Sequence, residues 1–214
     1  MRDEAEGHEE GLEPRGRTDR RLRADARRNI ETLLEAAMRV FATSGVEAPA
    51  REIAGRAGVG VGTLYRHFPQ RADLIVAVFR NEVDACADAA RALAAEYEPG
   101  EALDRWLQRY IDFIAAKRGL SAALHSGNPA FASLPIYFQE KLRPALQGLL
   151  EAAAKAHKVR ADIDAAELLL AVARLCAPNG QGGVNEQSRR MVGLLVDGLR
   201  YGAPTALPRA PPTA

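Results

Sequence analysis

The apolar residues of this 214-residue chain recur at intervals of three and four over almost its whole length. That period places them on one face of an α-helix, whereas a half-buried strand would alternate apolar and polar residues. No segment of the sequence alternates in that way, and alanine is abundant while aromatic residues make up only 6% of the chain. The pattern therefore predicts an all-α protein of about nine helices.

Glycine and proline divide this helical pattern into two domains between two tails. We expect a disordered tail over residues 1–20, which carry almost no apolar side chains, and a proline-rich tail over 202–214. Between the tails the pattern predicts a three-helix domain over 21–70 and a larger helical domain over 71–201. The predicted helices span about 24–44, 49–57, 61–68, 70–97, 101–117, 119–126, 132–157, 164–177 and 185–201.

Positive charge is concentrated near the N-terminus, although the whole chain has a net charge of only +1. Residues 1–13 hold one arginine and six acids, residues 15–71 hold twelve arginines and six acids, and the remainder is balanced. Such a basic segment is the electrostatic footprint of a phosphate-bearing partner, although a solvated basic arm would carry the same charge. Five of these arginines could enter a neighbouring minor groove of DNA, and a freely solvated arm is the alternative. They are Arg20, Arg21, Arg23, Arg27 and Arg28.

Two of the predicted helices are separated only by the turn Gly58-Val59-Gly60. We expect Gly58 to adopt a positive φ there, because glycine does so without steric cost. Two short helices joined by such a turn form a helix-turn-helix, whose second helix enters the major groove of DNA. Ile53, Leu64 and Phe68 would form a small core with the first helix. This arrangement leaves Val61, Gly62, Thr63, Tyr65, Arg66 and His67 facing outward.

The segments around this turn resemble the TetR family of bacterial transcriptional regulators over about residues 26–80. The resemblance rests on Phe41-Ala-Thr-Ser-Gly45, Arg51-Glu-Ile-Ala-Gly-Arg-Ala-Gly-Val59, Gly62-Thr-Leu-Tyr-Arg-His-Phe-Pro69 and Arg71-Ala-Asp-Leu74. Later, Phe113-Ile-Ala-Ala-Lys-Arg-Gly-Leu120 and the segment 142–150 resemble the SbtR-type branch more loosely. The chain departs from the family at Ala48-Pro49, where a capping Ser or Thr is usual, at Gly60, and at Arg71, where Lys is usual.

The chemistry of these residues predicts how they would contact DNA. Tyr65 and His67 carry polar tips on stiff rings that suit phosphate oxygens, and Arg71 opens a helix whose N–H groups also attract phosphate. The resemblance implies the same for these three. Arg66 could reach a guanine and Val61 a thymine methyl group, and for each residue an ordinary exposed position is the alternative. The predicted DNA-binding residues are Ser44, Arg51, Val61, Gly62, Thr63, Tyr65, Arg66, His67 and Arg71.

The larger domain carries aromatic residues where the resemblance implies an effector cavity. An aromatic stripe is more often core than cavity wall, so a solid core is the alternative. A few polar groups would orient the ligand, and Arg174 stands out because it lies within an apolar helix. The predicted ligand-binding residues are Phe79, Cys86, Trp106, Tyr110, Phe113, Leu124, His125, Tyr137, Phe138 and Arg174.

The last two helices carry apolar stripes that predict a homodimer interface. Packing within a single chain is the alternative, and the resemblance implies a four-helix bundle made by two subunits. The predicted interface residues are Leu168, Val172, Leu175, Met191, Leu194, Leu195, Gly198 and Leu199.

Together these features predict a ligand-responsive repressor that binds a pseudo-palindromic operator in double-stranded DNA as a homodimer and releases it when a largely apolar small molecule binds. An activator, or a ligand-independent regulator of the same fold, is the alternative. An enzyme and a non-specific chromosome-binding protein are rival classes. The sequence has no catalytic constellation and no metal-ligand spacing, so we expect no enzyme activity, metal or cofactor. The sequence has neither a secretory signal nor a membrane span, so we expect a cytoplasmic protein. Because the cytosol keeps thiols reduced, we expect Cys86 and Cys176 to be buried thiols.

Overall fold

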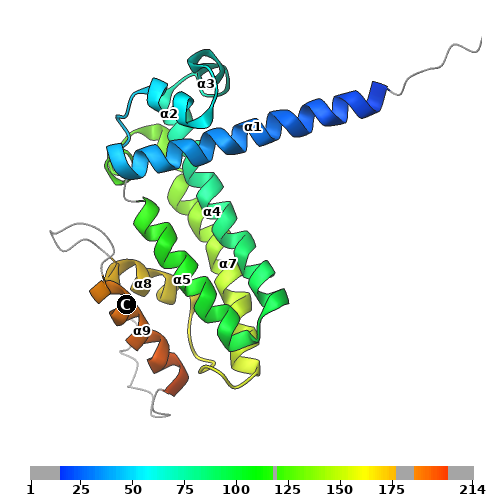
Figure 1. Cartoon of the computed structure of the whole chain (residues 1–214). Coiled ribbons are helices and arrows are strands. Elements are labelled where there is room, and N and C mark those ends of the chain that lie inside the picture. The colour runs from blue at the N-terminus through cyan, green and yellow to red at the C-terminus, as the bar shows by residue number, and fades with distance from the viewer. Residues whose placement is uncertain (1–14, 118–119, 177–185, 202–214) are drawn as a thin grey trace, which may run out of the picture.

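The computed structural model describes residues 15–117, 120–176 and 186–201, and every regular element within them is helical (Figure 1). This confirms the prediction of an all-α protein. The tails expected at 1–14 and 202–214 lie outside the described residues.

The N-terminal domain consists of α1 (Arg15–Ser44), α2 (Ala50–Ala57) and α3 (Val61–His67). Its core joins Leu33 and Phe41 of α1 to Ile53 of α2 and Leu64 of α3, all buried. Gly58, between α2 and α3, has a φ of 70°, which confirms the predicted left-handed turn. Because that turn reverses the chain in so few residues, α3 lies against the other two helices with one face still open.

The first helix begins earlier than predicted. Residues 15–20, which the sequence assigned to the disordered tail, belong to α1. Low apolar content removes a reason for a segment to pack, but arginine is a good helix former and does not require an apolar face to extend a helix that is already nucleated. The first half of α1 extends away from the rest of the molecule (Figure 1).

The C-terminal domain is built on three long helices that lie side by side (Figure 1). They are α4 (Arg71–Glu96), α5 (Pro99–Lys117) and α7 (Leu134–Lys155). The short α6 (Ser121–Leu124) and a 3₁₀ turn, η2 (Pro129–Phe131), lie between α5 and α7. α4 also packs on α1, so it connects the two domains.

Two further helices pack on this bundle, α8 (Ala165–Leu175) and α9 (Glu186–Tyr201). The carboxylate of Asp164 accepts hydrogen bonds from the first-turn N–H groups of Ala166 at 2.8 Å and Glu167 at 3.0 Å. Such a cap satisfies donors that a helix leaves open at its start, and it explains where α8 begins. Residues 177–185, between α8 and α9, lie outside the described residues.

Two aromatic residues of α5 link the helices of the bundle. Trp106 is fully buried, and its Nε1 donates to the carbonyl oxygen of Cys86 in α4 at 2.9 Å. The Tyr110 hydroxyl donates to the carbonyl oxygen of Leu169 in α8 at 3.1 Å. Because both polar atoms are buried with a partner, these links hold α4, α5 and α8 in one relative arrangement.

Candidate functional site

The outer face of α3 is the first candidate site. Tyr65 is 51% exposed, and Val61, Arg66 and His67 are exposed beside it. Leu64, on the opposite face, is buried in the core and holds the helix in place. The structure therefore presents these residues to solvent as the sequence predicted.

The start of α3 is open as well. No side chain caps this helix, and the carbonyl oxygen of Gly60 accepts from the N–H groups of Thr63 at 2.9 Å and Leu64 at 3.3 Å. A Cβ placed on Gly62 would meet no atom within 4 Å. The backbone at Gly62 can therefore approach a flat partner such as a base-pair edge closely. Thr63 is half-buried.

The two remaining candidates outside α3 and α4 differ in how freely they could meet a phosphate. Arg51 is exposed in the first turn of α2. The Ser44 hydroxyl donates to Oε1 of Glu52 at 3.2 Å, so it already has an acceptor within the protein. A phosphate oxygen would have to displace that carboxylate.

Arg71 differs from the prediction. Its Nη1 and Nη2 donate to the carbonyl oxygens of Val46 and Ala48, in the segment between α1 and α2. Both acceptors belong to buried residues, and Arg71 itself is half-buried. The guanidinium has five donors in a planar fork, which lets it bridge two carbonyl groups at once. The structure thus shows Arg71 connecting α4 to the chain before α2, a role that its sequence position did not reveal.

The aromatic residues of the C-terminal domain form a packed stack. The ring centroids of Trp106 and Tyr110 are 5.6 Å apart, those of Tyr110 and Phe113 are 6.1 Å apart, and those of Phe113 and Phe138 are 6.0 Å apart. Phe79 packs edge-on against Phe113 at 6.3 Å. Rings at these separations are in mutual contact, so this stack belongs to the core. The residues predicted to line a cavity therefore pack against one another in this structure, and their role in ligand binding stays a prediction.

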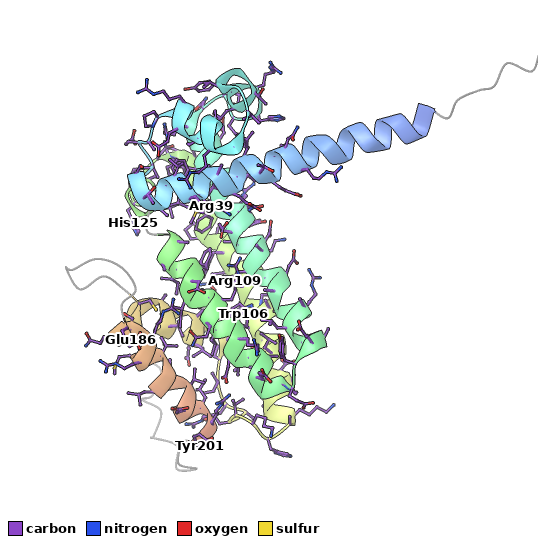
Figure 2. All side chains as sticks on the ribbon, in the orientation of Figure 1. Arg39, Trp106, Arg109, His125, Glu186 and Tyr201 are labelled. Carbon is purple, nitrogen blue, oxygen red and sulfur yellow. The ribbon has the colours of Figure 1, made fainter. Side chains whose placement is uncertain are left out.

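The predicted polar anchors do not lie in that stack. His125 and Arg174 are exposed, and Figure 2 shows His125 at the edge of the molecule, far from Trp106 inside the bundle. The apolar stretch around Arg174 suggested burial, but this residue occupies the outer side of α8, where its charge remains in water. Cys86 is fully buried and Leu124 is half-buried.

One polar group beside the stack was missed by the sequence analysis. The Nζ atom of Lys117, at the end of α5, lies 5.9 Å from the ring centroid of Phe79 and 5.6 Å from that of Phe138. Burial lowers the pKa of this amine, because the charged form loses its water. A lysine in the last turn of a helix is commonplace, so its position in the sequence gave no signal of this contact.

A groove with a volume of about 720 Å³ lies between α4 and α7. Alanine and glycine make up five of its twelve lining residues, and none of the ten predicted ligand-binding residues lines it. Beside the lining residue Asp84, the Tyr137 hydroxyl lies 2.7 Å from each carboxylate oxygen and donates its one proton to that carboxylate, and Lys141 Nζ lies 3.3 Å from the same carboxylate. The lining residues are Asp84, Ala87, Asp88, Ala90, Arg91, Ala94, Glu140, Lys141, Pro144, Ala145, Gly148 and Leu149.

The predicted dimer residues divide into two groups. Leu168, Val172 and Leu199 are buried within the protomer, because α8 and α9 need an apolar face to pack on their own bundle. A second apolar face remains exposed. Leu194 of α9 is 63% exposed and Leu170 of α8, which was not predicted, is 51% exposed. Leu175, Met191 and Gly198 are exposed and Leu195 is half-buried.

The described residues also bear on metal sites and membrane spans. In residues 15–117, 120–176 and 186–201, no three His, Cys, Asp or Glu side chains gather where they could hold a metal ion. Over the same part of the chain, no helix combines the length and apolar character needed to span a membrane.

Known proteins resemble the chain over both domains. Residues 33–78 match the model for bacterial regulatory proteins of the tetR family, and residues 98–201 match the model for the C-terminal domain of SbtR-like transcriptional regulators. The chain is 29% identical over 109 residues to an HTH-type transcriptional regulator of Staphylococcus aureus strain USA300. That alignment covers 50% of this chain and 59% of the relative, so the chain spans about three-fifths of the length of these curated relatives.

Two solved structures extend the likeness to nearly the whole fold. A TetR transcriptional regulator from Streptomyces coelicolor is 38% identical, with a TM-score of 0.67 over 81% of this chain and 99% of that one. A TetR transcription regulatory protein from Mycobacterium vanbaalenii is 39% identical, with a TM-score of 0.66 over 84% of this chain and 99% of that one.

Proposed function

Because this chain belongs to the TetR family of transcriptional regulators, we propose that it is a ligand-responsive repressor that binds a pseudo-palindromic operator as a homodimer. The observation that carries the proposal is the open face of α3. It combines an accessible backbone at Gly62 with exposed Tyr65, Arg66 and His67, beside a buried Leu64 that keeps the helix rigid.

Each exposed residue of α3 has a distinct proposed role. The Tyr65 hydroxyl and the His67 ring donate to phosphate oxygens and set the register, which is independent of sequence. Arg66 reads a guanine through two parallel hydrogen bonds, and Val61 contacts a thymine methyl group. Thr63 and Arg51 add contacts to the backbone or to bases, and Ser44 contributes only if it leaves Glu52.

Homodimer formation is supported by the second apolar face of α8 and α9. Leu170 and Leu194 are large apolar side chains with more than half of their surface in water within the protomer. Large apolar side chains exposed on two neighbouring helices are what a protein interface would cover. A two-fold dimer would present two copies of α3 to two half-sites, which is why the operator is expected to be pseudo-palindromic.

A selection from random-sequence DNA tests this proposal. The protein should enrich a two-fold symmetric sequence and bind it at least about a thousandfold more tightly than random DNA, the usual margin of a specific regulator. Tyr65→Ala should weaken binding to every sequence, whereas Arg66→Ala should also relax the preference at one base pair of each half-site. Equal affinity for selected and random DNA would overturn the proposal in favour of a non-specific binder.

The packed aromatic stack supports the ligand-independent alternative, because its rings contact one another and leave no space for an effector among them. For a ligand-responsive repressor we therefore place the effector site in the groove between α4 and α7 instead. Its alanine and glycine residues suit a largely apolar body, and its lining residues of both charge signs suit polar ends. Ala145→Trp should fill the groove. A compound that releases the operator should bind this variant more weakly than it binds the parent. For the parent, operator DNA should lower the affinity for the compound by the same factor by which the compound lowers the affinity for operator DNA. A compound that acts equally on both proteins would exclude the groove.

A further inference from the structure

The positive charge of the N-terminal domain does not lie in its helix-turn-helix. Residues 29–71 hold five arginines and four glutamates, so this compact unit is nearly neutral. Residues 15–28 hold seven arginines, two aspartates and no lysine. Almost the whole excess of positive charge is therefore in the first half of α1.

This half of α1 lies outside the packed domain. The described core of α1 begins with the half-buried Ile30 and the buried Leu33. Upstream of them, Leu22 is the only large apolar residue between 15 and 28, so the sequence there offers no apolar face for packing. Figure 1 shows this half of α1 extending into solvent, at the end of the molecule that carries α3 and on the side away from α8 and α9. A helical segment that extends from the domain and whose sequence carries this charge is suited to a partner.

We propose that the first half of α1, residues 15–28, is a second DNA-binding surface that contacts the duplex flanking the operator. This inference rests on the proposed function, because it takes α3 as the reader of the operator and α8 with α9 as the dimer interface. With the partner subunit on the side of α8 and α9, the two basic helices point outward, beyond the two half-sites.

The dimensions of the helix fit that placement. Fourteen residues at about 1.5 Å each extend for roughly 21 Å. Duplex DNA carries one negative charge for about every 1.7 Å of its axis, so a helix of that reach passes about six base pairs and several phosphates on each strand. Arginine, with its planar fork of donors, is also the residue that binds phosphate in two-point fashion and enters a narrow minor groove.

A nearly neutral helix-turn-helix makes this surface necessary for strong electrostatic attraction. The salt dependence of DNA binding measures how many phosphates a protein neutralises, with a slope of about −0.9 for each one. The five arginines and four glutamates of residues 29–71 nearly cancel, whereas residues 15–28 have a net charge of +5. Contacts from the first half of α1 should therefore make this slope steeper.

The test compares two duplexes and two matched variants. One duplex ends at the outer edges of the selected operator, and the other adds about 10 base pairs on each side, more than the roughly 21 Å reach of the helix. In the test variant, Arg17, Arg20 and Arg21 are replaced by Gln, which has nearly the same helix propensity. The control variant removes the same charge from exposed ion pairs of the C-terminal domain through Arg105→Gln, Arg143→Gln and Arg160→Gln.

The parent and the control variant should bind the flanked duplex at least about tenfold more tightly than the short one at about 150 mM salt, and with a salt slope steeper by about two to three. The test variant should bind both duplexes with the affinity that the parent has for the short one. Circular dichroism should show the same helix content in all three proteins.

Three results would overturn this proposal. One is equal affinity of the parent for both duplexes, which would leave the proposed function intact. Another is an equal loss by the test variant on both duplexes, which would place these arginines within the operator. The third is tighter binding to the flanked duplex that appears only after residues 2–13 are deleted, because this segment of one arginine and six acids would then occupy the basic surface in place of DNA. Failure to select any operator would instead overturn the proposed function, and this inference with it.

Discussion

The contact between Arg71 and the chain before α2 predicts a stability effect that a DNA contact would not have. Arg71→Gln removes two hydrogen bonds to the carbonyl oxygens of Val46 and Ala48. Hydrogen bonds from a charged donor contribute about 1.5–3 kcal/mol each. Arg71 is half-buried, so water would replace part of what is lost, and we expect the free energy of unfolding to fall by about 2–3 kcal/mol in total.

This loss is measurable by thermal unfolding. For a chain of this size, 1 kcal/mol shifts the Tm by about 2–4 °C, so Arg71→Gln should lower it by roughly 4–12 °C. All proteins must be compared at one concentration, because the Tm of a dimer depends on it. Arg66→Gln is the matched control. Arg66 is exposed on α3, and its loss should change the free energy of unfolding by less than about 0.5 kcal/mol while it weakens operator binding.

A lysine at the same position separates the two roles of Arg71. Arg71→Lys keeps a positive charge at the start of α4, but one ammonium group cannot hold both carbonyl oxygens in the geometry of a guanidinium. We therefore expect this variant to lose most of the same stability. The reasoning is refuted if Arg71→Gln leaves the Tm within about 1 °C of the parent and reduces operator affinity, because Arg71 would then act as a phosphate contact.

Three further predictions concern the C-terminal domain. Leu194→Glu should produce a monomer by sedimentation velocity, whereas Ile136→Glu, at an equally exposed position of α7, should remain dimeric; a dimeric Leu194→Glu protein would reject the interface. Tyr110→Phe should lower the free energy of unfolding in urea by about 0.5–1.5 kcal/mol, because it removes the buried hydrogen bond from the Tyr110 hydroxyl to the Leu169 carbonyl oxygen; an unchanged value would show that this bond does not stabilise the fold. Burial raises the pKa of the Cys86 thiol to about 12, so iodoacetamide should modify it at about pH 8 only after unfolding; rapid labelling of the folded protein, detected by mass spectrometry, would contradict this.

The helix-turn-helix was predictable because its signals are local. The positive φ at Gly58 follows from a turn too tight for other residues, and Pro69 marks where α3 must end. Helical periodicity then separated buried Leu64 from exposed Tyr65. Each of these inferences uses residues within one turn of a helix, so nothing about the rest of the fold was needed.

The roles of Arg71 and Arg174 were beyond such reasoning. Arg71 binds carbonyl groups 23 and 25 residues away, and no local pattern indicates which backbone segment a long side chain will meet. Arg174 lies in an apolar run, yet its own position on α8 faces water. A helix with apolar residues on most of its surface gives little indication of which face a single charged residue will occupy.

The aromatic residues show a third kind of limit. Trp106, Tyr110 and Phe113 are all buried residues of α5. Whether such rings enclose a cavity or fill it depends on how far apart the neighbouring helices are, and that distance is a property of the whole bundle. The groove between α4 and α7 escaped prediction for a related reason, because its lining joins alanine, glycine and charged residues of two helices whose separation the sequence does not show.

The length of α4 has a mechanical consequence. Its 26 residues extend for about 39 Å, from the groove of the C-terminal domain to the bond between Arg71 and the chain before α2. A rod of that length that tilts by about 5° about one end moves its other end by roughly 3.4 Å, which equals the rise of one base pair. Arg71, the first residue of α4, is bonded to the chain before α2. In the proposed dimer, a tilt of α4 that a ligand imposes far from the DNA would therefore shift each α3 by about the rise of one base pair.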